Sequence, residues 1–205
     1  MKLSDILMLP ERTYQNLSDR KTTLCLGIIF IGIADLAIYF IDEFKKLFVG
    51  QSSQTLLYNI SLAILLVIAM GLIDIMFFVV PLFDLFKMFK KDKDIKEDGQ
   101  MRVKLAKVYI LAHTIIVPVN IIVYFVFRNA NNNTAGVLTV LAAYISLIVW
   151  VWFSMTISRG INLIYSFQLL FKRVVLLVVF IWTLLTGSAI DYIIRNWIMM
   201  LFGNI

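Results

Sequence analysis

Five long apolar segments dominate this chain of 205 residues. Each holds roughly 20 residues with few charges, the length that an α-helix needs to cross the hydrocarbon core of a bilayer. We therefore expect an all-α, polytopic integral membrane protein, a bundle of five transmembrane helices with short interfacial helices. The expected spans are residues 23–41, 57–80, 107–127, 137–157 and 174–194.

The composition fits a bilayer better than it fits water. Apolar residues make up 61% of the chain and charged residues 16%, whereas soluble domains are roughly 45–50% apolar and about 25% charged. No polar stretch is long enough for a soluble domain, so we expect one membrane domain over 1–205. The first apolar run follows a polar, partly acidic stretch over 1–22 and is long enough to span, which does not fit a cleavable signal peptide.

The Lys and Arg residues sort to one side of such a bundle. With a cytoplasmic N-terminus, 15 of the 19 cations fall on the inner side, and short loops rich in Lys and Arg stay in the cytoplasm. This asymmetry predicts an N-in, C-out, multi-pass protein of the plasma membrane, and the Ile-, Lys- and Asn-rich usage favours a bacterial one.

The basic cytoplasmic loop at 88–106 is the main charged feature of the sequence. Its cations would meet anionic lipid headgroups, or another membrane protein or a second copy of this chain; nucleic acid is not an expected partner. The residues predicted for this basic face are Lys87, Lys90, Lys91, Lys93, Arg102 and Lys104.

Three segments outside the spans are expected to lie at the membrane surface. Residues 4–21 form a cytoplasmic segment in which Pro10 suits the first turn of a short amphipathic helix. Pro81 lacks the N–H that would bond back one turn, so span two should end at residue 80. Residues 82–90 should then be an interfacial helix with its Phe residues toward lipid, and the apolar loop 158–173 should be interfacial or re-entrant.

Ionisable side chains inside the spans are the main candidates for a functional site, because they cost several kcal/mol when exposed to lipid and often mark function. Asp35, Asp74 and His113 qualify. Asp74 and His113 each lie six residues, ~9 Å, from the predicted inner interface, so they share a depth and could pair. Asn120 follows His113 by seven residues on the same face. The pair would be either a proton or ion relay or a clamp that fixes helix packing.

The sequence offers little for catalysis. The chain has one His and one Cys, no Gly-rich phosphate loop and no metal-ligand spacing. We therefore expect no enzyme, no cofactor and no metal.

Two segments resemble the Yip family of Rab-interacting membrane proteins, especially its bacterial members. The first is Pro10-Glu11-Arg12-Thr13-Tyr14-Gln15-Asn16-Leu17, and the second is Ile145 to Ile157 with the apolar loop that follows. The resemblance implies a five-span membrane adaptor without established catalytic residues, so it assigns no site. A non-enzymatic adaptor or organiser of membrane complexes is the first functional hypothesis. The alternative is a small permease or transporter subunit that uses Asp74, His113 and Asn120, and a lipid-modifying enzyme is the weakest.

Overall fold

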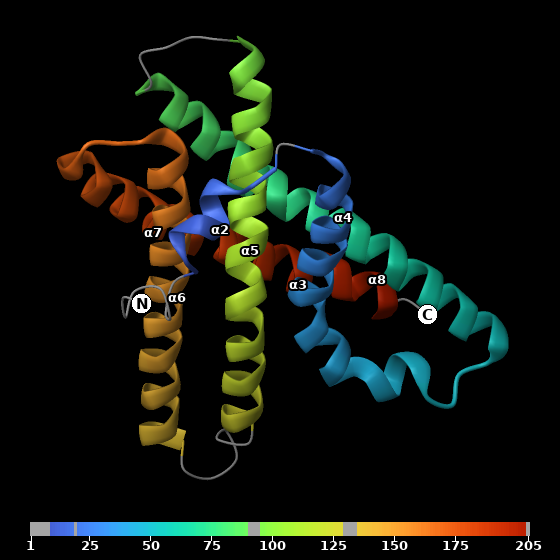
Figure 1. The fold of residues 1–205 in the computed structure, drawn as a ribbon. Coiled ribbons are helices and arrows are strands. Elements are labelled where there is room, and N and C mark those ends of the chain that lie inside the picture. Colours follow the sequence, from blue (N-terminus) through green and yellow to red (C-terminus); the bar gives the residue numbers. More distant parts are fainter. Residues whose placement is uncertain (1–8, 19, 90–94, 129–134, 204–205) are drawn as a thin grey trace.

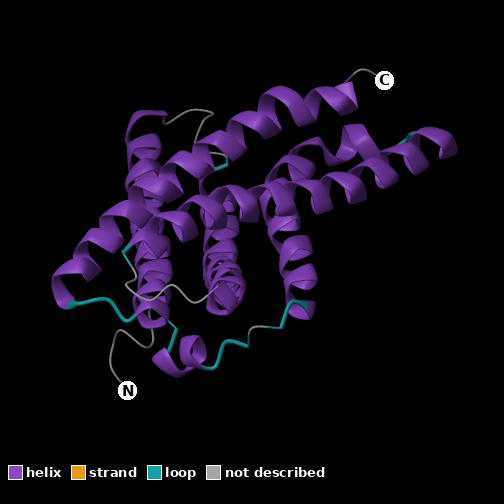
Figure 2. Cartoon of the chain, turned by 90° about the horizontal axis from the view of Figure 1, so that it is seen from above, coloured by secondary structure: helices purple, strands orange, loops and turns teal. Residues whose placement is uncertain are grey.

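The computed structural model describes residues 9–18, 20–89, 95–128 and 135–203. These residues are helical apart from short connections (Figure 2), and no strand occurs among them. The elements are α2 (Glu11–Gln15), α3 (Thr22–Phe48), α4 (Ser53–Met88), α5 (Ile95–Phe127), α6 (Ala135–Tyr165), α7 (Leu169–Ile193), a π-helical turn (Ile194–Ile198) and α8 (Met199–Gly203).

Five of the described helices are long and apolar enough to cross a membrane, as the sequence predicts. They are α3, α4, α5, α6 and the nearly continuous run from Leu169 to Phe202. All five are longer than the predicted spans. This architecture is that of a multi-pass membrane protein.

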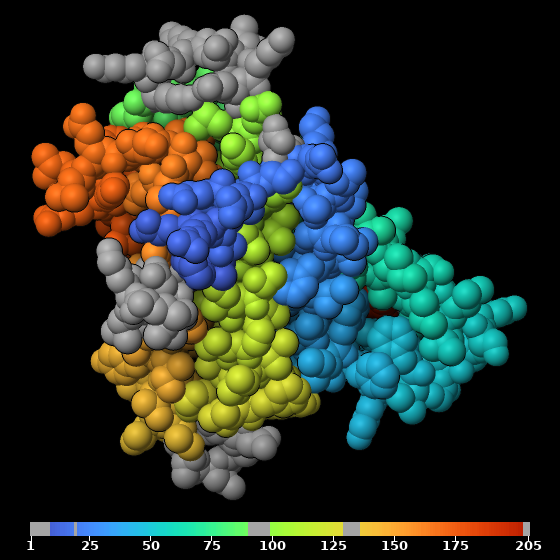
Figure 3. Space-filling view, viewed as in Figure 1, coloured from blue at the N-terminus to red at the C-terminus, as the bar shows by residue number. Residues whose placement is uncertain are grey.

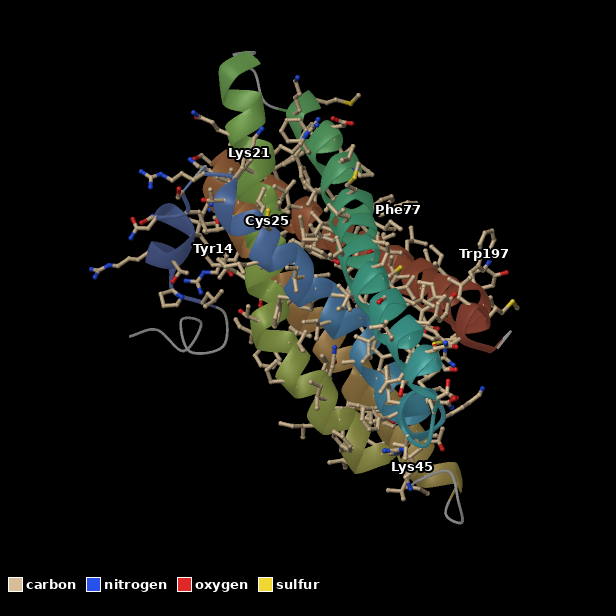
Figure 4. All side chains as sticks on the ribbon, turned by 90° about the vertical axis from the view of Figure 1, so that its right-hand side faces the viewer. Tyr14, Lys21, Cys25, Lys45, Phe77 and Trp197 are labelled. Atoms are coloured by element: carbon tan, nitrogen blue, oxygen red, sulfur yellow. The ribbon has the colours of Figure 1, made fainter. Side chains whose placement is uncertain are left out.

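The helices are not all parallel. Helices α5 and α6 stand side by side, with α3 next to α5, while α4 and the α7–α8 run cross behind them at a steep angle (Figure 1). Large apolar side chains point away from the bundle, among them Phe77 and Trp197 (Figure 4), which are 53% and 69% exposed. Such residues suit contact with lipid.

The expected break at Pro81 is wrong. Helix α4 runs without interruption from Ser53 to Met88, with Pro81 inside it. The missing N–H costs a hydrogen bond, but the turn after the proline buries Leu82, Phe83 and Phe86 in the core. Residues 82–88 therefore extend the span, and the prediction that these Phe residues face lipid is also wrong; residues 90–94 lie outside the described chain.

The apolar segment 158–173 is mostly helical, and the prediction that it forms a loop is wrong. Helix α6 continues through it to Tyr165, and α7 begins at Leu169. Three residues connect them, and Ser166 has a positive φ of 52° that reverses the chain. The segment is too short to span the bilayer alone. Its apolar residues belong to the end of α6 and the beginning of α7.

The short helix predicted after Pro10 is present as α2, which lies across α5 and α6 (Figure 3). Tyr14 is buried, its ring lies against Gly160, and its hydroxyl donates a hydrogen bond to the backbone oxygen of Thr156 at 3.0 Å. The buried ammonium of Lys107 donates to the backbone oxygen of Ser18 at 2.5 Å. Two polar anchors therefore fix this segment to the bundle.

The docking of α2 should depend on pH through Tyr14. Burial raises the pKa of Tyr14 to about 12, and the nearby Arg159 lowers it by less. Because the docked pKa lies above the usual value of about 10, docking is fully stable below pH ~10 and weakens as the pH rises toward 12. The difference in tyrosinate absorbance between the wild type and Tyr14→Phe should titrate near pH 12. A midpoint near 10 would mean that the phenol is solvated.

Candidate functional site

The site begins at a close crossing of α3 and α4. A Cβ atom added to Gly32 would collide with the backbone oxygen of Val67, and one added to Gly71 would collide with that of Ile28. Only glycine therefore allows the two backbones to come this close. Small residues have the same role at membrane helix crossings in general.

The crossing places two carboxylates together. Asp35 follows Gly32 by three residues, and Asp74 follows Gly71 by three, so each Asp lies on the same face as its glycine. The two helices are joined by a short connection and run in opposite directions. Because side chains tilt toward the N-terminus of their own helix, the two carboxylates lean toward each other across the crossing.

Helix α5 adds an imidazole to the two carboxylates. One ligand atom each from Asp35, Asp74 and His113 lies within 4.8 Å of the other two. Asp35 and His113 are the middle residues of Thr22–Phe48 and Gly99–Phe127, so the cluster lies at the centre of the bundle. The depth predicted for Asp74 and His113, six residues from the inner interface, stays a prediction.

Tyr109 holds two of these groups in place. Its hydroxyl donates to both oxygens of Asp74, at 3.0 and 2.8 Å. Its backbone oxygen lies 3.0 Å from Nδ1 of His113. Since a carbonyl oxygen can only accept, Nδ1 carries a proton, and in a neutral ring Nε2 then keeps its lone pair. The oxygen Oδ2 of Asp35, by contrast, is buried without a hydrogen-bond partner in the described part of the chain.

The cluster lies at one end of a cavity of about 250 Å³. From the cluster, the cavity extends along α3 to Tyr39, along α5 to Asn120, and along α7 to Asp191. All three stretches run toward the same end of the bundle, the end at which α3 and α5 terminate. Three Asp and no Lys or Arg occur among the described residues that line the cavity.

The opposite side of the cluster is closed by apolar core. Phe78, Leu105, Val108 and Ile157 are each 0% exposed, and the ring of Phe78 stacks on Tyr109 with centroids 3.9 Å apart. On this side of the cluster, the described side chains are therefore closely packed.

A polar network lies at the end of the cavity away from the central cluster. The hydroxyl of Tyr39 donates to Asp191, and Nε of Arg195 lies 2.9 Å from the same carboxylate. Arg195 thus neutralises Asp191. No Lys or Arg among the described cavity-lining residues does the same for the two central carboxylates, Asp35 and Asp74.

The structure brings together the residues that the sequence singled out. Asp74, His113 and Asn120 all line the cavity. Sequence reasoning named Asp35 as a candidate but did not place it beside Asp74 and His113, and it missed Tyr109 as the residue that positions Asp74. A signal for Asp35 was present, because Gly32-Ile33-Ala34-Asp35 and Gly71-Leu72-Ile73-Asp74 repeat one Gly-x-x-Asp spacing. The sequence predicted no metal, whereas the three side chains form a set that could hold an ion.

The predicted basic face is described only in part. Lys87 and Arg102 are exposed, and Lys104 is half-buried beside Tyr14. Arg102 lies 3.8 Å from Asp84 and over the ring of Phe83. Lys90, Lys91 and Lys93 lie outside the described residues.

Comparison of the chain with family models, with curated proteins and with solved structures finds no match. The resemblance to the Yip family therefore stays a prediction.

Proposed function

We propose that this protein is a membrane permease that moves a cation, the proton included, through the central site formed by Asp35, Asp74 and His113. The observation that carries the proposal is the meeting of these three ionisable groups at one end of a cavity. A packing clamp needs neither the cavity nor a carboxylate oxygen left without a partner.

Electrostatics favours a cation as the transported species. Two unit negative charges about 5 Å apart repel by roughly 3 kcal/mol at an effective dielectric constant of about 20. No Lys or Arg among the described cavity-lining residues offsets this repulsion. A bound proton or metal ion would offset the repulsion. It would leave again if the two carboxylates became exposed to water.

The geometry also supports an alternating-access cycle. A cation enters past the polar network at Tyr39 and Asp191 and binds between Asp35 and Asp74. It leaves on the other side only when the apolar core around Phe78 and Ile157 opens, and closure of one side at a time is what prevents a leak.

Flux measurements on purified protein in liposomes test this function. We expect proton or cation flux from the wild type, and a fall of about tenfold or more for Asp74→Asn and for His113→Ala, since 1.4 kcal/mol on the barrier lowers a rate tenfold. Asp84→Asn is the matched control, because Asp84 lies on the same helix and is exposed outside the cavity.

Absence of flux from folded wild-type protein would reject the permease. The adaptor hypothesis from the sequence would then gain support, and it predicts a stable complex with a membrane partner without any flux.

A further inference from the structure

We infer that Asp35, Asp74 and His113 bind a divalent transition-metal ion, with Zn²⁺ as the representative case. This inference rests on the proposed function, since it names the class of ion that the same site carries. It starts from the closeness of the three ligand atoms, each within 4.8 Å of the others, on three different helices.

The donor set selects the ion class. Two carboxylates and one imidazole match the nitrogen and oxygen ligands of three-ligand Zn²⁺ sites. Mg²⁺ and Ca²⁺ prefer oxygen ligands alone, and a proton needs only one acceptor. Cys25, the single thiol, is exposed on α3 well before Asp35 and is not among the residues lining the cavity. The soft ligands that select Cu⁺ are therefore missing from this set.

The surroundings of the ligands are those that metal sites use. A histidine that binds a metal almost always donates its other ring N–H to a carbonyl or a carboxylate, and Nδ1 of His113 does so to the backbone oxygen of Tyr109. Ligating carboxylates are in turn hydrogen-bonded, and both oxygens of Asp74 share the single proton that the hydroxyl of Tyr109 donates. One residue thus orients two ligands and leaves Nε2 of His113 free to bind.

The third ligand supplies an independent observation. Oδ2 of Asp35 is buried and has no hydrogen-bond partner in the described residues. A buried carboxylate oxygen without a partner is costly, and a metal ion at this position would satisfy it. Asp35 is also one of the residues that line the cavity.

The geometry fits an exchangeable site better than a permanent one. Ligands about 2.1 Å from a tetrahedral Zn²⁺ lie roughly 3.4 Å apart, so the side chains must close slightly around the ion. Three protein ligands leave a fourth position for water, and the adjacent cavity supplies it. An ion held in this way can enter and leave, as a transported ion must.

Metal binding to the full-length, tag-free protein in detergent tests the inference. Zn²⁺ titration calorimetry gives the affinity, and visible absorption of bound Co²⁺ reports the geometry. We expect one ion per chain, an affinity loss of roughly 100-fold or more for Asp35→Asn and for His113→Gln, and a loss of about 10- to 100-fold for Tyr109→Phe. Asp84→Asn should bind as the wild type does.

The unfolding midpoint of each variant, measured without metal, separates lost binding from lost folding. Equal Zn²⁺ affinity in the wild type and in folded Asp35→Asn would overturn the inference. So would Asp74-dependent proton flux from a protein that binds neither Zn²⁺ nor Co²⁺, although the permease would stand. Tight Zn²⁺ binding with no flux of Zn²⁺, protons or alkali cations would uphold the site and reject the permease.

Discussion

Gly71→Val is expected to lower the thermal unfolding midpoint in detergent by several degrees and to separate Asp74 from Asp35. The new Cβ would collide with the backbone oxygen of Ile28 and would lie 3.0 Å from the backbone nitrogen of Gly32. A backbone cannot move aside as a flexible side chain can, so α3 and α4 must part. Overpacking of this kind costs about 1–3 kcal/mol or more, and each kcal/mol shifts the midpoint by about 2–4 °C at this size.

Gly99→Val is the control for this change. Gly99 lies inside α5, and an added Cβ would meet nothing within 4 Å. Replacing an exposed helical glycine raises helix propensity, so the midpoint should not fall. The Co²⁺ spectrum should be lost in Gly71→Val alone. Equal midpoints for the two variants would mean that α3 and α4 do not cross at these glycines.

The sequence could predict the number of spans because that depends on a strong local signal. A run of about 20 apolar residues has few alternatives to a membrane helix, and all five predicted runs are helices. Helix ends were predicted less well, because in α5 the helix extends back into the charged stretch before Lys107, where the apolar pattern has already stopped. The side of the membrane on which each end lies stays a prediction.

Pro81 shows where local rules give the wrong result. For a helix in water, the missing N–H of a proline predicts a break. Here the lost hydrogen bond is offset because the next turn packs Leu82, Phe83 and Phe86 into the core. Membrane helices tolerate proline when neighbouring helices compensate in this way. That outcome depends on contacts between helices, which no single segment of sequence contains.

The sequence could predict only those features of the candidate site that follow from the spacing of residues along one helix. His113 and Asn120 share a face by spacing, and both line the cavity. Asp35 joins Asp74 because two glycines let α3 and α4 touch, which is a property of a pair of helices. The repeated Gly-x-x-Asp spacing is the trace of that contact in the sequence.

Gly187→Leu should close the cavity while leaving every ionisable residue in place. Gly187 lines the cavity on α7, and a Cβ there would collide with the ring of Trp150 on α6. A leucine would bring four carbons into a space of about 250 Å³, and its Cβ would displace the indole. We expect cation flux to fall by about tenfold or more, because 1.4 kcal/mol on the barrier suffices for that.

Ser188→Leu is the matched control, because Ser188 is the next residue on α7, is exposed and does not line the cavity. It adds the same side chain to the outer surface of the helix, so its flux and its unfolding midpoint should stay near those of the wild type. Wild-type flux in Gly187→Leu would place the route of the ion outside this cavity. The central carboxylates would then have to be reached through the apolar core beside Phe78, and the one-sided entry proposed for this protein would be wrong.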